Sequence, residues 1–266
     1  MKQRIISAVV LLAIFIPILL IGKIPFAILM TLLAWIGLHE LLNVRKKKKE
    51  FPTAMKLISY ILIALLVITN YNTNEMVFYM DYRLIAMLMF AYITPIIFVK
   101  DSKKYTLNDA LYLIASTLFI GFSFNLFITI RNFSLNYIVY LFLISTITDT
   151  FALLTGRKIG KHYLAPKISP KKTIEGAIGG SIMGTFVGSV FFIEVIGLNV
   201  NMFGVILMSL VLSILGQIGD LVFSAIKRYY NTKDFSNLIP GHGGILDRLD
   251  SIIFIVLGFL IFLSVL

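Results

Sequence analysis

The stretch "MFGVILMSLVLSILGQIGDLVFSAIKR", residues 202–228, decides what kind of fold this chain can form. Residues 202–225 are almost entirely apolar, and about 20 such residues are what a helix needs to cross the hydrocarbon core of a bilayer. Lys227 and Arg228 follow this apolar run, and one carboxylate, Asp220, lies inside it. The stretch therefore predicts a membrane-spanning helix with an ionisable group, which inside a span usually marks function.

The composition of the whole chain supports the same interpretation. Of its 266 residues 59% are hydrophobic and 14% are charged, whereas soluble proteins average about 45–50% and about 25%. The chain has no cysteine, so disulfides, thiolate catalysis and cysteine metal sites are excluded. Its net charge of +11 is typical of cytoplasmic loops that face anionic membrane lipid. The sequence thus predicts an all-α, polytopic integral membrane protein with no nucleic-acid partner.

Nine segments are apolar enough to be candidate spans. A β-barrel would instead show shorter runs of alternating polarity, so a helical bundle of about nine transmembrane helices is predicted. The nine predicted spans are residues 5–21, 24–44, 55–70, 84–99, 110–130, 136–155, 174–197, 202–225 and 249–266.

The basic residues divide unequally between the two sides that nine spans would create. The N-terminus and the segments 45–56, 100–109, 156–173 and 226–248 hold 21 of the 24 lysines and arginines. Because lysine and arginine stay in cytoplasmic loops, the N-terminus is predicted to be cytoplasmic and the C-terminus to lie outside the cell membrane. The first apolar run resembles a signal peptide but lacks a small-residue cleavage site, which favours a retained first span.

Two regions follow from this layout. Residues 1–135 would supply five scaffold spans, and residues 136–266 would form a catalytic region of four spans with the cytoplasmic loops 156–173 and 226–248. In the seventh span glycine recurs every four residues, which makes a smooth ridge where a second helix can approach closely. That helix could belong to the same chain or to a second copy. The ridge consists of Gly176, Gly180, Gly184 and Gly188.

Five acidic residues lie at or near the inner ends of the last four spans, where lipid makes an ionisable group costly. Asp220 is flanked by apolar residues on both sides, and Asp247 and Asp250 are spaced to share one face of a helix. An N-terminal cap would explain one member of that pair but not the need for Asp220. The five residues are Asp149, Glu175, Asp220, Asp247 and Asp250.

Another acidic residue, Glu40, follows His39 in "HELLN" at the end of the second predicted span. The pattern is similar to the HExxH zinc motif of metalloproteases, but Asn43 stands where the second histidine would be. A zinc site is therefore not predicted here.

The basic loops have the character of an anion site. The segment "ISPKKTIEG", residues 168–176, places two lysines and two hydroxyls directly before a helix, whose free N–H groups favour a bound anion. Carboxylates together with lysine and arginine at a membrane surface suggest Mg²⁺ that holds a polyphosphate. A Walker-type phosphate loop is excluded, because "GRKIGKH" has one residue too few between its glycines and no serine or threonine after the lysine.

Residues 224–250, "SAIKRYYNTKDFSNLIPGHGGILDRLD", resemble the signature of the phosphatidate cytidylyltransferase (CDP-diacylglycerol synthase) family. The serine, Lys-Arg, Lys-Asp, His-Gly-Gly, Asp-Arg and final Asp all stand at the positions of the family pattern. Residues 217–224 and 156–176 are similar to the family as well, so the resemblance covers the C-terminal half. Two departures are the absence of a Gly-Ala-Tyr run after Asp149 and the presence of Ile174 where a tryptophan is common.

The resemblance implies that CTP and phosphatidate (phosphatidic acid) react to give CDP-diacylglycerol and pyrophosphate with Mg²⁺, at the cytoplasmic face of the membrane. It implies that Asp220 and Asp247 hold two cations, the second of unspecified identity. The residues with an implied role in catalysis are Asp220, Asp247, Asp250, Lys172, Lys227 and Arg228. The expected substrate-binding residues, not divided between CTP and phosphatidate, are Ser169, Lys171, Lys172, Thr173, Ser224, Lys227, Arg228, Lys233, Asp234, His242, Gly243, Gly244 and Arg248.

Three other functions compete with this one. An ion- or proton-coupled transporter also carries aspartates in its spans, but near the midplane between repeated halves, and the sequence shows no internal repeat. A CDP-alcohol phosphotransferase needs aspartates around a DG…AR core, which the chain lacks. A CTP-dependent lipid kinase would transfer the γ-phosphate and release CDP. A homodimer is expected from the glycine ridge and the resemblance, while acyl-chain preference and the choice between CTP and dCTP stay open.

Overall fold

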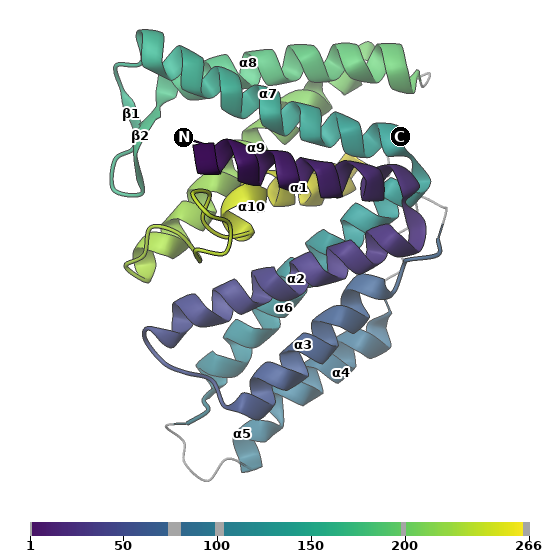
Figure 1. Cartoon of the computed structure of the whole chain (residues 1–266), viewed down its shortest axis with the longest axis vertical. Helices are drawn as coiled ribbons and strands as arrows, with labels where there is room; N and C mark the ends of the chain where they lie inside the picture. Colours follow the sequence, from purple (N-terminus) through teal and green to yellow (C-terminus); the bar gives the residue numbers. More distant parts are fainter. Residues whose placement is uncertain (1, 74–80, 99–103, 198–200, 263–266) are drawn as a thin grey trace. The chain divides into compact units, whose positions relative to one another are not determined.

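The computed structural model describes residues 2–73, 81–98, 104–197 and 201–262, most of which are helical (Figure 1). Each of the nine predicted spans overlaps a helix, although residues 99 and 263–266, at the ends of two of them, lie outside the described residues. Within the described residues, five helices are long and apolar enough to cross a membrane. The chain is therefore a multi-pass membrane protein, and the count of nine crossings stays a prediction.

The chain divides into two compact units. Unit 1 comprises Met1–Phe133 and Asp234–Leu246, and unit 2 comprises Ser134–Lys233 and Asp247–Leu266. The segment Asp234–Leu246 thus groups with the N-terminal helices, although the sequence predicted it as part of one catalytic region from residue 136 onward. The physical reason is a set of hydrogen bonds from this segment to the second helix.

In unit 1, α2, α3 and α4 all pack against α6, along which a long run of residues is buried (Figure 1). The buried Asn125 of α6 donates from its amide to the backbone carbonyls of Leu66 and Val67 at the end of α3, 3.0 Å away in each case. The fourth predicted span is interrupted before Pro95, which has no N–H to continue a helix. The helices are α1 (Lys2–Ile21), α2 (Lys23–Lys46), α3 (Thr53–Ile68), α4 (Tyr82–Ile93), α5 (Pro95–Phe98) and α6 (Leu107–Phe133).

Unit 2 contains four long helices and a small hairpin that the all-α prediction did not include. The hairpin strands run antiparallel, with Tyr163 opposite Thr173, and they occupy the predicted cytoplasmic loop between α7 and α8. The elements are α7 (Leu135–Ile159), β1 (Tyr163–Ala165), β2 (Ser169–Thr173), α8 (Ile174–Phe191), the π-helical turn η1 (Phe192–Ile196), α9 (Met202–Tyr229) and α10 (Leu246–Phe262), whose first residue belongs to unit 1.

The glycine ridge of α8 packs against α7 of the same chain. A Cβ atom added to Gly180 would lie 2.6 Å from the backbone oxygen of Thr148, and one added to Gly176 would lie 2.7 Å from the backbone oxygen of Ala152. The two backbones therefore touch, and any side chain on the ridge would separate them. Since the partner helix is in the same chain, the ridge no longer supports a homodimer.

Two further glycines bring α9 and α10 together in unit 2. A Cβ atom on Gly216 would lie 2.8 Å from Cδ1 of Ile255, and one on Gly219 would lie 2.7 Å from the backbone oxygen of Asp250. This close approach places the next residue, Asp220, beside the first turns of α10.

The ridge leads to a test with two glycine-to-alanine substitutions. Gly180→Ala should destabilise the protein by about 1–3 kcal/mol, because the new methyl group meets the α7 backbone, which cannot rotate away. Gly204→Ala in α9 is the matched control, since its Cβ would meet no atom within 4 Å and alanine favours a helix. The measurement is the thermal unfolding midpoint in detergent. Equal midpoints for the two variants would contradict the packing of α8 on α7.

Candidate active site

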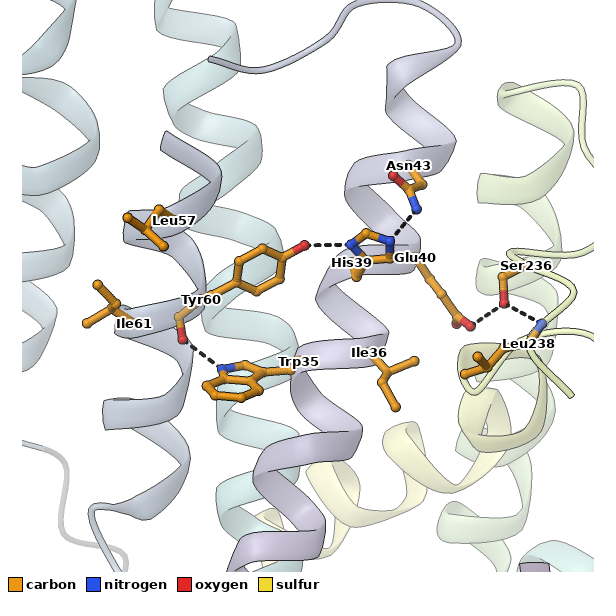
Figure 2. Close-up of a pocket in the computed structure, with 10 residues that line it drawn as sticks. All are labelled: Trp35, Ile36, His39, Glu40, Asn43, Leu57, Tyr60, Ile61, Ser236 and Leu238. Atoms are coloured by element: carbon orange, nitrogen blue, oxygen red, sulfur yellow. Dashed lines mark hydrogen bonds between the residues drawn. The ribbon is translucent and has the colours of Figure 1, made fainter. Parts of the chain in front are cut away.

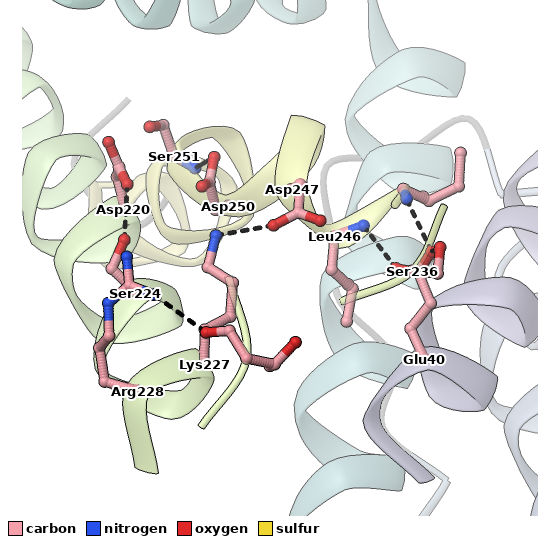
Figure 3. Close-up of polar contacts among 12 residues, drawn as sticks. Glu40, Asp220, Ser224, Lys227, Arg228, Ser236, Leu246, Asp247, Asp250 and Ser251 are labelled. Atoms are coloured by element: carbon pink, nitrogen blue, oxygen red, sulfur yellow. Dashed lines mark hydrogen bonds and ion pairs between the residues drawn. The ribbon is translucent and has the colours of Figure 1, made fainter. Parts of the chain in front are cut away.

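A buried ion pair joins α9 to α10 in unit 2 (Figure 3). The Lys227 ammonium donates to Oδ1 of Asp247 at 2.7 Å, and the two side chains are only 10% and 3% exposed. Two charges so far from water are tolerated only because each neutralises the other. The pair therefore fixes the end of α9 to the beginning of α10.

A second ion pair brings the hairpin to the same part of α9. The ammonium of Lys172, on β2, lies 2.5 Å from Oδ2 of Asp220, and both side chains are 28% exposed. Ser224, one turn further along α9, donates its hydroxyl to Oδ1 of the same carboxylate at 3.3 Å. Three residues predicted for the site, from two different elements, thus meet in the structure.

Two more carboxylates surround these pairs. Asp250, one turn after Asp247, lies close enough to Asp220 and Asp149 for its charge to be repelled by both. Asp149, on α7, is in turn attracted to Lys172. Asp149 had no role assigned from the sequence, and the structure adds it to the cluster. Four carboxylates and two lysines thus lie close together in this part of unit 2.

The fifth carboxylate, Glu175, has a different environment. It accepts hydrogen bonds from the backbone N–H groups of Lys161 (3.1 Å) and His162 (3.2 Å). Its other oxygen lies 2.6 Å from Nδ1 of His162. Glu175 therefore ties the first turn of α8 to the segment that enters the hairpin.

The predicted anion site before α8 is partly occupied by the protein itself. The hydroxyl of Thr173 accepts a hydrogen bond from the N–H of Gly176 and so caps the helix. Arg228 donates to the backbone oxygens of Ile168 (3.3 Å) and Thr232 (3.0 Å), which holds the hairpin turn against the end of α9. Lys171 is exposed on β2, next to Lys172.

The other residues predicted to bind substrate are divided between the two units. Ser169, Lys233 and Arg248 belong to unit 2, and Lys233 and Arg248 are exposed. The residues that belong to unit 1 are Asp234, His242, Gly243 and Gly244.

Several of these unit 1 residues have a role in the local conformation of the chain. Nδ1 of His242 lies 2.8 Å from the hydroxyl of Ser7. Gly243 has a φ of +85°, a conformation that favours glycine. Gly244 contacts Glu40 so closely that a Cβ atom would collide with its carboxyl group. A direct contact of these residues with phosphate stays a prediction.

The chemistry of the donor set fits a hard divalent cation, since several carboxylates lie close enough to repel one another. Within the described residues, however, no three acidic or histidine side chains already converge on one point. Asp220 and Asp247 instead pair with Lys172 and Lys227. One oxygen of each of these two carboxylates is therefore paired with a lysine in this structure.

Unit 1 contains a pocket of about 730 Å³ beside α2 and α3 (Figure 2). The histidine of the "HELLN" stretch, His39, borders this pocket, with Nδ1 2.6 Å from the Tyr60 hydroxyl and Nε2 2.7 Å from the Asn43 amide. Both ring nitrogens are therefore engaged within the protein. The lining residues are Trp35, Ile36, His39, Glu40, Asn43, Leu57, Tyr60, Ile61, Ser236 and Leu238.

Comparison with known proteins shows the family to which the chain belongs. The sequence profile of the cytidylyltransferase family matches residues 2–266, so the chain belongs to the cytidylyltransferase family and is a nucleotidyltransferase. Relatives named phosphatidate cytidylyltransferase include one from Staphylococcus haemolyticus, 38% identical over 96% of each chain. Another, from Bacillus subtilis, is 37% identical over 99% of this chain and 97% of its own, and one from Staphylococcus aureus is 38% identical over 96% of each.

The buried ion pair can be tested by removing one charge at a time. Lys227→Met should destabilise the protein by about 3–5 kcal/mol, because it removes the ammonium that neutralises the buried Asp247 carboxylate. The double variant Lys227→Met/Asp247→Asn should regain much of that loss, since both charges of the pair are then absent. Thermal unfolding in detergent measures both, with the exposed Lys171→Met as a control of small effect on stability. A double variant less stable than Lys227→Met would contradict the pairing.

Proposed function

We propose that this chain transfers the cytidylyl group of CTP to phosphatidate, which gives CDP-diacylglycerol and pyrophosphate for phospholipid biosynthesis. The observation that carries the proposal is the cluster of carboxylates and lysines where β2, α9 and α10 meet in unit 2. Comparison supports the proposal, because relatives that align with nearly the whole chain are named phosphatidate cytidylyltransferase.

The proposed reaction makes one bond and breaks one. An oxygen of the phosphatidate phosphate attacks the α-phosphorus of CTP, and the bond from this phosphorus to the oxygen that bridges to the β-phosphate breaks. Pyrophosphate leaves with the electron pair of that bond. A phosphate monoester is already an anion near neutral pH, so no strong general base is needed. The main task of the site is to bring two polyanions together and to neutralise the charge that develops.

The two lysines of the cluster suit that task. Lys172 and Lys227 would exchange their aspartate partners for phosphate oxygens when the substrates bind, and Arg228 would add a fixed positive charge at the end of α9. Asp220 and Asp247, released by the lysines, would hold Mg²⁺ and a second cation, with Asp250 in support. When bound there, Mg²⁺ would neutralise phosphate charge and polarise the reacting phosphoryl group.

The finer features of the proposal concern place and assembly. The reaction would occur at the cytoplasmic face of the cell membrane, where a cytosolic nucleotide meets a lipid phosphate, as the distribution of lysine and arginine suggests. Assembly as a homodimer now rests on the family resemblance alone. Further substrate contacts are proposed for Ser169, Lys171, Thr173, Ser224, Lys233, Asp234, His242, Gly243, Gly244 and Arg248.

The products decide between this function and its competitors. Purified protein in detergent should convert CTP, phosphatidate and Mg²⁺ into CDP-diacylglycerol with one pyrophosphate released per lipid formed. The measurement is identification of the released phosphate compound together with the lipid product. Release of CDP would indicate a lipid kinase, and ion flux in liposomes without turnover would indicate a transporter; either result would contradict the proposal.

Substitution of the two aspartates tests their proposed role. Asp220→Asn and Asp247→Asn should each lower turnover by at least about 10²-fold, because the reacting phosphates lose stabilisation of developing charge. Asp81→Asn is a matched control, since Asp81 caps α4 in unit 1 and asparagine caps a helix equally well. Initial rates are compared at equal amounts of monodisperse protein. Near-normal rates for either variant at ordinary Mg²⁺ would show that the assignment is wrong.

Removal of the metal gives a further test. Chelation with EDTA should abolish turnover, and added Mg²⁺ should restore it, because the lysines alone do not balance the charge of two polyanions. The rate is followed before chelation, after it and after Mg²⁺ is added back. Full activity in excess EDTA would contradict a metal requirement.

A further inference from the structure

Glu40 is a buried acidic residue to which the proposed reaction assigns no role. It lies in α2 with 1% of its surface exposed. Three donors contact its two carboxyl oxygens: the Ser236 hydroxyl at 2.6 Å and the backbone N–H groups of Ile245 and Leu246 at 2.9 Å each (Figure 3). All three donors come from the segment Asp234–Leu246.

The fit between this segment and α2 is close on both sides of the carboxyl group. Gly244 leaves no room for a side chain, because a Cβ atom there would collide with the Glu40 carboxyl group. A Cβ atom on Gly37, almost one turn before Glu40, would lie 3.1 Å from Cδ2 of the fully buried Leu246. The loop backbone therefore reaches α2 because Gly244 has no side chain, and Gly37 leaves room on α2 for the Leu246 side chain.

The contact between Glu40 and the loop stabilises the beginning of α10. The first N–H groups of a helix have no partner inside the helix, and an acidic group placed there satisfies them and interacts favourably with the helix dipole. The residue directly before α10 is Ile245, whose apolar side chain cannot cap. The cap instead comes from Glu40, 206 residues earlier in the chain.

The partners of Glu40 are unusual for a carboxylate in an apolar helix. Among the ion pairs of the described residues none includes Glu40. The pocket that it borders has no lysine or arginine among its lining residues (Figure 2). An acidic residue in a span is costly, and the hydrogen bonds described here for Glu40 come from the loop and the helix start that it holds.

We propose that Glu40 is a positioning residue for the reaction. By holding the N–H groups of Ile245 and Leu246, it fixes the direction in which the backbone enters α10, and with it the orientation of the next residue, Asp247. The inference rests on the proposed function, because that function gives Asp247 its task at the phosphates. Glu40 itself touches no reacting atom.

Hydrogen–deuterium exchange tests the contact independently of turnover. Glu40→Ala and Glu40→Gln should speed exchange in a peptide that covers residues 235–247, because the amides of Ile245 and Leu246 lose their acceptor. Exchange in α3 and α6 should stay as in the unchanged protein. Glu50→Gln is the matched control, since Glu50 is half-exposed and pairs with Lys46 and Lys56 in the loop after α2.

Turnover tests the positioning. Glu40→Ala should lower kcat by about 10²-fold, as expected when a reacting group is displaced by about 1 Å, and should leave the KM for CTP little changed. Glu40→Gln should lower kcat less, because its amide oxygen can still accept one hydrogen bond. Glu50→Gln should turn over at the normal rate.

A double-substitution cycle tests the coupling from the other side of the contact. Gly244→Ala alone should lower kcat, because the methyl group displaces the Glu40 carboxyl group. In the background of Glu40→Ala the same substitution should lower kcat by a smaller factor, since the carboxyl group with which it collides is gone. Independent effects of the two substitutions would contradict the coupling.

The outcomes separate the inference from the proposed function. Faster exchange confined to residues 235–247, with the graded loss of kcat, supports it. Unchanged exchange overturns the inference, and so does faster exchange with a normal kcat. Faster exchange throughout unit 1, even in Glu40→Gln, also overturns it, because this result would show that Glu40 only stabilises the fold. If the unchanged protein makes no CDP-diacylglycerol, the proposed function and the catalytic part of the inference both fail, while the exchange result still decides whether Glu40 caps α10.

Discussion

The Lys227 ammonium and the Asp247 carboxylate lie 2.7 Å apart and are buried, in a chain that is otherwise mostly apolar. Neither charge is tolerated alone in such surroundings, so the pair forces α9 and α10 to stay in register. The close contact of the two helices is possible because Gly216 and Gly219 leave no side chains between them. The same contact places Asp220 beside the first turns of α10, and the cluster follows from that.

The chemical character of this cluster comes from carboxylates and lysines that lie together. Asp149 and Asp250 are both close enough to Asp220 for like charges to repel, and Lys172 and Lys227 pair with Asp220 and Asp247. One of those lysines, Lys172, is carried to α9 by strand β2 of the hairpin, whose turn accepts a hydrogen bond from Arg228 of α9. Carboxylates beside lysines would suit this cluster to bind cations and phosphates in turn, if the lysines exchange partners as proposed. For this reason the reaction is proposed for the cluster and not for the mostly apolar pocket of unit 1.

Features that depend on neighbouring residues could be predicted from the sequence, and features that depend on distant ones could not. The helices follow from continuous apolar runs, and Asp220 was singled out because a charge in an apolar run is conspicuous. Asp247 and Lys227 lie outside the predicted spans and were assigned their roles from the family resemblance of residues 224–250. The partner of the glycine ridge, the hairpin and the pairing of Glu175 with His162 required the structure. Glu40 was visible as an acidic residue in a predicted span, but its role as a cap arises from a contact across 206 residues.

We propose that Asp220 and Asp247 bind a divalent cation and are not only partners of lysines. Binding of Mn²⁺ alone, followed by the loss of its free electron paramagnetic resonance signal as protein is added, tests this most directly. The unchanged protein and Asp81→Asn should bind Mn²⁺, whereas Asp220→Asn and Asp247→Asn should bind it much more weakly. Equal binding by all four proteins would show that these two aspartates are not cation ligands.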